Sequence, residues 1–120
     1  MTTNVFRDQE KFMLACDQSV TGDQDQFDMY INLIAEEFEE LQDADTDVAT
    51  LDALIDILVV TIGAIHSMGA NGEHAWIEVM RSNFAKIDHD TGKVRKREDG
   101  KVLKPEGWKP PELEQFLRKN

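Results

Sequence analysis

The feature that most constrains this chain is an apolar segment at residues 51–65 that contains two aspartates, Asp52 and Asp56. Asp56 has apolar neighbours on both sides in the sequence, and burying an isolated carboxylate among them costs several kcal/mol. Buried charges in proteins are paired with an opposite charge or coordinate a metal ion. Only two basic residues precede Asp56, so an ion-pair partner would have to come from the C-terminal half. We therefore favour a metal site.

An acidic run, EEFEE at residues 36–40, supplies the carboxylates that such a site needs. On helices, Glu37 and Glu40 are spaced i,i+3 and Asp52 and Asp56 are spaced i,i+4, so each pair projects from one helix face. Four carboxylates that meet between two helices require a cation, because like charges repel strongly in a dry site. Oxygen ligands favour Mg²⁺ or Mn²⁺ over zinc. Taken alone, Glu37 and Glu40 fit a solvated helix face equally well.

The net charge of −11 is unevenly distributed along the 120 residues. Residues 1–56 carry a net charge of −13 and residues 57–120 carry +2. An acidic front half argues against nucleic acid as a partner, because phosphate binding needs a basic face. The only cysteine, Cys16, rules out an intrachain disulfide, and its apolar surroundings predict a buried thiol. No apolar signal segment opens the sequence, and the apolar run is interrupted by Asp56, so we expect a cytoplasmic protein with no membrane contact.

Hydrophobic periodicity predicts an all-α fold of four to five helices followed by a short C-terminal β-hairpin and an extended tail. We expect one domain, 1–120, whose helical core covers about 5–87 and whose basic hairpin and tail cover about 88–120. The expected helices are 5–16 with Asn4 as N-cap, 26–43, 47–68 with Thr46 or Asp47 as cap, and 72–87 with Asn71 as cap. A last helical turn is expected near 112–117.

Basic and polar side chains in the second half form a second group of candidates. Asn83 and Lys86 are spaced i,i+3 on the last helix, so they share a face. A site that binds metal and phosphate needs cations as well as carboxylates, and we assign Lys86 and Lys101 to phosphate binding. The other bases of the expected hairpin fit solubilising charges that protect its edge, and this applies above all to Lys93, Arg95 and Lys96.

Other chemistries lack the residues that they need. The three histidines have no spacing that builds a transition-metal site, and Glu-x-x-His pairs of the di-iron bundles are missing. No glycine-rich phosphate loop is present. The serines have no base and acid at a suitable spacing, so nucleophilic catalysis is unsupported.

Residues 31–43, INLIAEEFEELQD, and 51–63, LDALIDILVVTIG, resemble the MazG-like all-α nucleoside triphosphate pyrophosphohydrolases. That superfamily, which includes phosphoribosyl-ATP pyrophosphohydrolase, carries E-E-x-x-E on one helix and E-x-x-D on the next. Glu36, Glu37 and Glu40 match the first half. The second half departs from it, since Ala53 stands three residues before Asp56 and the acid is Asp52. RSNFAKID at 81–88 and REDGKVLKPEGWKPPEL at 97–113 resemble a subgroup labelled phosphoribosyl-ATP pyrophosphohydrolase-like.

The resemblance implies a MazG-like bundle that hydrolyses a nucleoside triphosphate between its α- and β-phosphates. It implies that Glu37, Glu40 and Asp56 hold Mg²⁺, for which Mn²⁺ can substitute, and that Asp52 is a further ligand or accepts a hydrogen bond beside the ligands. Glu36 would ligate another ion or accept the proton of the attacking water. Phosphate or sugar oxygens would be bound by a polar set: Asn83, Lys86, Lys101 and Lys104. The resemblance also implies a homodimer or homotetramer.

Two other functions remain open on the sequence. One is hydrolysis of phosphoribosyl-ATP in histidine synthesis. The other is a non-catalytic helical module that binds a metal ion or a nucleotide without turnover.

Overall fold

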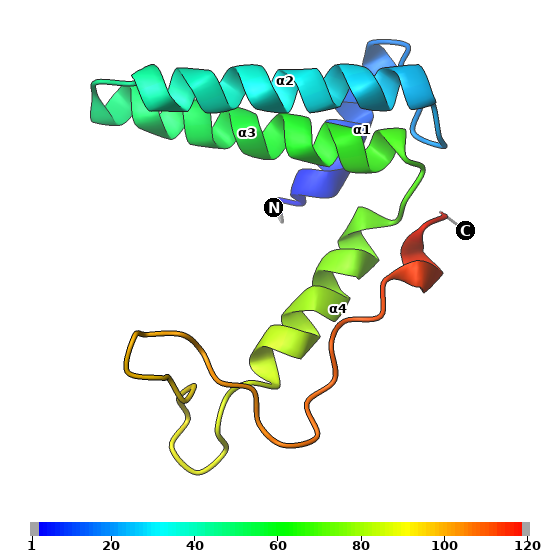
Figure 1. The fold of residues 1–120 in the computed structure, drawn as a ribbon. Helices are drawn as coiled ribbons and strands as arrows, with labels where there is room; N and C mark the ends of the chain where they lie inside the picture. Colours follow the sequence, from blue (N-terminus) through cyan, green and yellow to red (C-terminus); the bar gives the residue numbers. More distant parts are fainter. Residues whose placement is uncertain (1–2, 119–120) are drawn as a thin grey trace. The chain divides into compact units, whose positions relative to one another are not determined.

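The fold is all-α, as the periodicity predicts (Figure 1). The computed structural model describes residues 3–118. Their helices are α1 (Val5–Ala15), α2 (Gln24–Asp43), α3 (Asp47–Ser67), α4 (Gly72–Phe84) and a 3₁₀ turn, η1 (Glu114–Phe116). The described residues form two compact units. Among the described residues the helical unit comprises 3–72 and 116–118, and the C-terminal unit is Glu73–Gln115.

Polar caps fix where the first three helices begin. Asn4 accepts a hydrogen bond from the amide of Arg7 at 3.1 Å, and Thr46 accepts one from the amide of Ala49 at 3.1 Å. Both expected caps are therefore confirmed, because a side-chain oxygen satisfies an amide that has no partner within the helix. α2 begins two residues earlier than expected because Asp23 caps it.

α4 ends three residues earlier than expected. Beyond Phe84 the amide of Lys86 bonds to the carbonyl of Asn83, and the amide of Ile87 bonds to that of Phe84. These i to i+3 bonds tighten the last turn and end the α-helix. The periodicity of the apolar side chains continues through this turn, which is why it suggested a longer helix.

α2 and α3 run side by side as an antiparallel pair, and α1 also packs against α3 (Figure 1). Gly63 of α3 lies against the ring of Tyr30 of α2, where a Cβ would overlap the ring. The Tyr30 hydroxyl donates to Gln18 Oε1 at 2.5 Å. The buried core contains Met13, Tyr30 and Ala64, and partly buried apolar side chains surround it: Val20, Phe27, Leu33, Ile34 and Val60.

The apolar character of α3 exceeds what the helical unit buries. A stripe of large side chains at helical spacing is exposed by 44–62 %: Leu51, Leu54, Ile55 and Leu58. By length and composition alone α3 could also cross a membrane, and 22 % of its most apolar stretch is buried. This is weak evidence for a span, because core helices of soluble proteins meet the same criterion. The stripe shows that α3 has an uncovered face, as a helix at a subunit interface would.

Two expectations are wrong. Among residues 3–118 there is no β-hairpin, only isolated antiparallel bridges between Ile87 and Val94 and between Lys96 and Val102. A two-stranded ribbon with charged side chains and no sheet to pack on is marginal in water. Cys16 is exposed rather than buried, because it follows the last residue of α1 as its C-cap.

Candidate metal and phosphate site

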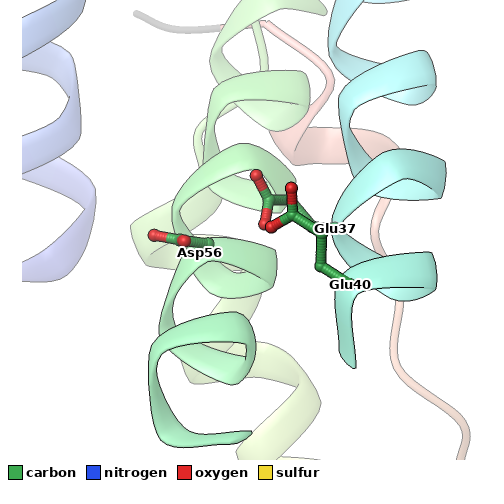
Figure 2. A group of neighbouring side chains, drawn as sticks. All are labelled: Glu37, Glu40 and Asp56. Atoms are coloured by element: carbon green, nitrogen blue, oxygen red, sulfur yellow. The ribbon is translucent and has the colours of Figure 1, made fainter. Parts of the chain in front are cut away.

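Three of the expected carboxylates meet between α2 and α3. Glu37 and Glu40 extend from α2 towards α3, which carries Asp56 (Figure 2). Each offers an oxygen within 4.8 Å of the others. Glu37 and Asp56 are half-buried and Glu40 is exposed, so the group opens to solvent on one side. Such an arrangement suits an ion that must admit water and substrate.

Glu37 is the electrostatically strained member of the group. Its Oε2 atom is buried and has no hydrogen-bond partner among the described residues. Loss of solvation is the largest cause that raises the pKa of Glu37. A hydrogen bond with Glu40, which only a protonated carboxyl can form, raises it further, and so do the charges of Glu40, Asp56 and Asp52. All these causes disfavour the ionised form, and a cation beside the carboxylate would reverse them. A buried carboxylate oxygen that has no hydrogen-bond partner and lies next to two other acids is therefore suited to bind a metal ion.

The spacing also fits a small divalent ion. Mg²⁺ holds oxygen ligands at about 2.0–2.1 Å, so two of its ligands lie at most about 4.2 Å apart. The oxygens here lie within 4.8 Å, and rotamer adjustments of long glutamate side chains can close that difference. The group could bind a metal ion.

The other two expected acids do not join this group. Glu36 and Asp52 are exposed, and neither belongs to the clustered carboxylates. Asp52 nevertheless lies near enough for its charge to raise the pKa of Glu37. Its i,i+4 relation to Asp56 places it on the same side of α3. Helical spacing places the two aspartates on one side of α3, and how deeply each carboxylate is buried depends on how α2 and α3 pack.

Two of the four expected phosphate-binding residues lie over an indole ring in the C-terminal unit, and a third contacts one of these two. The Lys86 ammonium lies 5.2 Å from the centre of the Trp108 ring and the Lys104 ammonium lies 4.8 Å from it. Lys86 Nζ also donates to Asn83 Oδ1 at 3.3 Å. Lys101 is exposed, and its amide donates to Asp99 Oδ1 at 3.2 Å. No pattern in the sequence indicated the contact of Trp108 with the two lysines.

Several of the remaining bases are already paired within the C-terminal unit. Arg81 Nε bonds to Glu78 Oε1 at 2.8 Å, and the amide of Glu112 donates to Glu78 Oε2 at 2.8 Å. These bonds lower the pKa of Glu78 to about 2. Arg97 forms an ion pair with Asp99. The guanidinium groups of Arg81 and Arg97 therefore already have carboxylate partners.

A groove of about 630 Å³, open to solvent, lies in the C-terminal unit beside Trp108. Arg81 and Lys109 contribute positive charge to its wall, and Asp88, Asp90 and Glu106 contribute negative charge. None of the three clustered carboxylates of α2 and α3 lines it. The groove has the volume of a small-molecule site, but its mixed charge does not by itself favour one ligand.

The fold and the site define an all-α protein in which two neighbouring helices bring together carboxylates that could bind a metal ion. A family profile described as phosphoribosyl-ATP pyrophosphohydrolase matches residues 16–83. The match covers more than half of the chain and includes Glu37, Glu40 and Asp56. The chain belongs to this family and so to the MazG-like superfamily of nucleotide pyrophosphohydrolases. No curated protein matched the sequence.

Members of the family are metal-dependent hydrolases that act on acid anhydrides, and they are typically soluble and cytoplasmic. The membership confirms the resemblance seen in the sequence and establishes the chain as a nucleotide pyrophosphohydrolase. A nucleotide substrate follows from the family.

Proposed function

We propose that the chain is a Mg²⁺-dependent nucleoside triphosphate pyrophosphohydrolase that cleaves between the α- and β-phosphates and releases a nucleoside monophosphate and pyrophosphate. The observation that carries the proposal is the convergence of Glu37, Glu40 and Asp56 between α2 and α3, with the buried Glu37 oxygen left unpartnered. Canonical or aberrant nucleoside triphosphates, with ribose or deoxyribose, are the proposed substrates.

Each acid has a proposed role. Glu37, Glu40 and Asp56 would hold Mg²⁺, for which Mn²⁺ would substitute, and Asp52 would add a ligand or accept a hydrogen bond beside the ligands. Bound Mg²⁺ would neutralise charge on the phosphates and lower the pKa of water to supply a nucleophile. Glu36, which is exposed one residue before Glu37, would ligate another ion or accept the proton of the attacking water on its carboxylate.

The polar residues of the C-terminal unit are proposed to bind the substrate. Asn83, Lys86, Lys101 and Lys104 would contact phosphate or sugar oxygens. Among the described residues, no ion pair occupies the ammonium groups of Lys86, Lys101 or Lys104, so all three are available to an anion. The triphosphate carries more negative charge than the metal ions offset, which is why cations are needed.

The oligomeric state, the domain count and the location are also proposals. We propose one domain over residues 1–120, a homodimer or homotetramer, a cytoplasmic location, and no nucleic-acid or membrane partner. The exposed apolar stripe of α3, formed by Leu51, Leu54, Ile55 and Leu58, supports self-association. Asp52 and Asp56 within the same helix count against a membrane span, because a charge at the bilayer centre is costly.

An alternative substrate is phosphoribosyl-ATP, which the family description names. Hydrolysis of phosphoribosyl-ATP would make the chain an enzyme of histidine synthesis. The bond cleaved would again be the one between the α- and β-phosphates. A second alternative is a module that binds a metal ion or nucleotide without turnover. It would show stabilisation by Mg²⁺ and no product.

The test is a panel of deoxynucleotides, ribonucleotides, modified nucleotides and phosphoribosyl-ATP, assayed for pyrophosphate with Mg²⁺ or Mn²⁺. We expect release that stops in EDTA and in Asp56→Asn. Glu39→Gln is the matched control, because Glu39 is exposed on α2 outside the clustered carboxylates. Turnover confined to phosphoribosyl-ATP would support the first alternative, and no turnover with any triphosphate would support the second.

A further inference from the structure

Two lysine ammonium groups in the C-terminal unit share the ring of Trp108. The distances from the ring centre are 5.2 Å for Lys86 and 4.8 Å for Lys104. The two charges therefore lie within about 10 Å of each other, the distance over which exposed charges still interact at 0.1 M salt. Neither ammonium has a carboxylate partner in the part of the chain that the structure describes. Two unpaired cations held on one ring repel, and a shared anion would relieve that repulsion.

The ring itself is fixed by α4. Trp108 Nε1 donates to the carbonyl of Ser82 at 2.7 Å, and the indole is half-buried. The amide of Trp108 also donates to the carbonyl of Pro105 at 3.1 Å, which closes the turn that carries it. Trp108 thus has an anchored position and orientation. A lysine side chain alone is flexible, so an anchored aromatic face limits where its ammonium can lie.

Lys86 is held from a second direction. Its Nζ donates to Asn83 Oδ1 at 3.3 Å, one turn earlier on the chain, while the same ammonium lies over the ring. The carbonyl of Ser82, which anchors the indole, directly precedes Asn83 in the sequence. The last turn of α4 therefore anchors the indole through Ser82 and contacts the Lys86 ammonium through the Asn83 side chain. Both ammonium groups lie over the anchored ring.

We propose that Trp108 is a positioning residue that holds Lys86 and Lys104 as one binding site for the di- or triphosphate group of the substrate and for the pyrophosphate product. The inference deepens the proposed function and rests on it for the substrate class. Trp108 acts through its contacts with the two lysines and not on the reacting atoms. A preformed pair of cations binds a polyphosphate more tightly than two mobile lysines, because less side-chain entropy is lost on binding.

The direct test is calorimetric titration of the full chain with inorganic pyrophosphate in EDTA, which separates this site from the metal site. We expect Trp108→Leu to weaken pyrophosphate binding about tenfold, and Trp108→Phe, which keeps an aromatic face, to weaken it about two- to threefold. Lys86→Met combined with Lys104→Met should abolish binding. The charge-matched control is Lys93→Met with Lys96→Met, both exposed, which should leave the Kd unchanged.

A second readout locates the ligand. The chain has two tryptophans, so in Trp76→Phe the indole emission comes from Trp108 alone. Pyrophosphate should change that emission with saturation at the calorimetric Kd. In turnover assays, Trp108→Leu should raise KM with little change in kcat, whereas a purely structural role would lower the melting temperature and leave KM unchanged.

The proposal is overturned if Trp108→Leu binds pyrophosphate as the parent does, or if the control pair weakens binding as much as the Lys86 and Lys104 pair. Failure of the proposed function is distinguishable from failure of this inference. A chain that turns over no nucleotide but binds pyrophosphate at Trp108 retains the site. An active enzyme in which Trp108→Leu changes neither the Kd for pyrophosphate nor the KM has no such site at Trp108.

Discussion

Glu37 on α2 and Asp56 on α3 present carboxylate oxygens within 4.8 Å of each other, although they belong to different helices. Glu40 completes the group, and one Glu37 oxygen is buried without a partner. In a protein without a cation at this point, such a pair is repulsive. The arrangement is therefore a cost to folding that a bound ion would reverse.

The first prediction concerns removal of one charge from this group. Asp56→Asn should lower kcat roughly a hundredfold or more, because a neutral amide is a poor ligand for Mg²⁺. In EDTA the same substitution should leave the melting temperature equal or higher, since it relieves repulsion. Calorimetry with and without Mg²⁺ measures both effects. The control, Glu39→Gln, should keep the stabilisation by Mg²⁺. If Asp56→Asn also keeps it, the ion binds elsewhere.

The second prediction is a pH dependence with a definite sign. The pKa of Glu37 is raised in the folded state by lost solvation and by its acidic neighbours. The folded protein therefore binds the proton more tightly than the unfolded chain, and its stability falls as pH rises from the ordinary glutamate pKa through the raised value. Denaturant unfolding in EDTA should show this decline, and Glu37→Gln should remove it. Added Mg²⁺ should stabilise the protein most at pH values above the raised pKa of Glu37, where the carboxylate is ionised. An equal decline in Glu37→Gln would assign the effect to other groups.

The third prediction tests the packing that places the carboxylates. Gly63→Ala should destabilise the protein by about 1–3 kcal/mol, because the new methyl group overlaps the ring of Tyr30 and forces α2 and α3 apart. The loss should be smaller in a Tyr30→Val background, where the ring is absent, and a double-mutant cycle measures the difference. An identical cost in both backgrounds would mean that the contact does not limit helix approach.

The fourth prediction concerns the exposed stripe on α3. Leu54→Glu and Leu58→Glu should convert the proposed dimer or tetramer to smaller species, because they place charges on an apolar face that is exposed in a single chain. Sedimentation measures the change. The control is Glu39→Lys on the exposed surface of α2. A parent protein that is monomeric at high concentration would contradict the proposal. Partition of the parent into vesicles would instead assign the stripe to a membrane.

The fifth prediction concerns the bonds of the C-terminal unit to Glu78. The pKa of Glu78 is lowered to about 2, first by Arg81 and then by the Glu112 amide. A lowered acid pKa contributes stability that is present above the ordinary glutamate value and is lost as pH falls towards 2. The protection of the Glu112 amide from hydrogen exchange should fall over that range, and Glu78→Gln should lower it at neutral pH. Unchanged protection in Glu78→Gln would show that this bond is not significant in solution.

Much of the helical fold could be read from the sequence because its signals are local. Asn4 and Thr46 cap helices through their own side chains, and apolar periodicity marks each helix. The errors lie where local and tertiary effects differ. Cys16 has apolar neighbours in sequence but follows the end of its helix, and the expected hairpin had no sheet to cover it.

The sequence predicted which helix faces carry the carboxylates of the candidate site, but not how deeply each carboxylate is buried. Helical spacing brought out four carboxylates as a set, Glu37, Glu40, Asp52 and Asp56, and the structure brings three of them together, Glu37, Glu40 and Asp56. Spacing gave no way to separate Asp52, which is exposed, from Asp56, which is half-buried. The contacts of Trp108 with Lys86 and Lys104 depend on how the tail returns to α4, which no local pattern encodes.

The most direct test of the central claim is ³¹P NMR of the products formed from a nucleoside triphosphate with Mg²⁺, run in parallel on the parent chain and Asp56→Asn. The parent should give a nucleoside monophosphate and pyrophosphate in equal amounts, and Asp56→Asn should give neither above background. Nucleoside diphosphate with orthophosphate, or equal product from both proteins, would contradict the account.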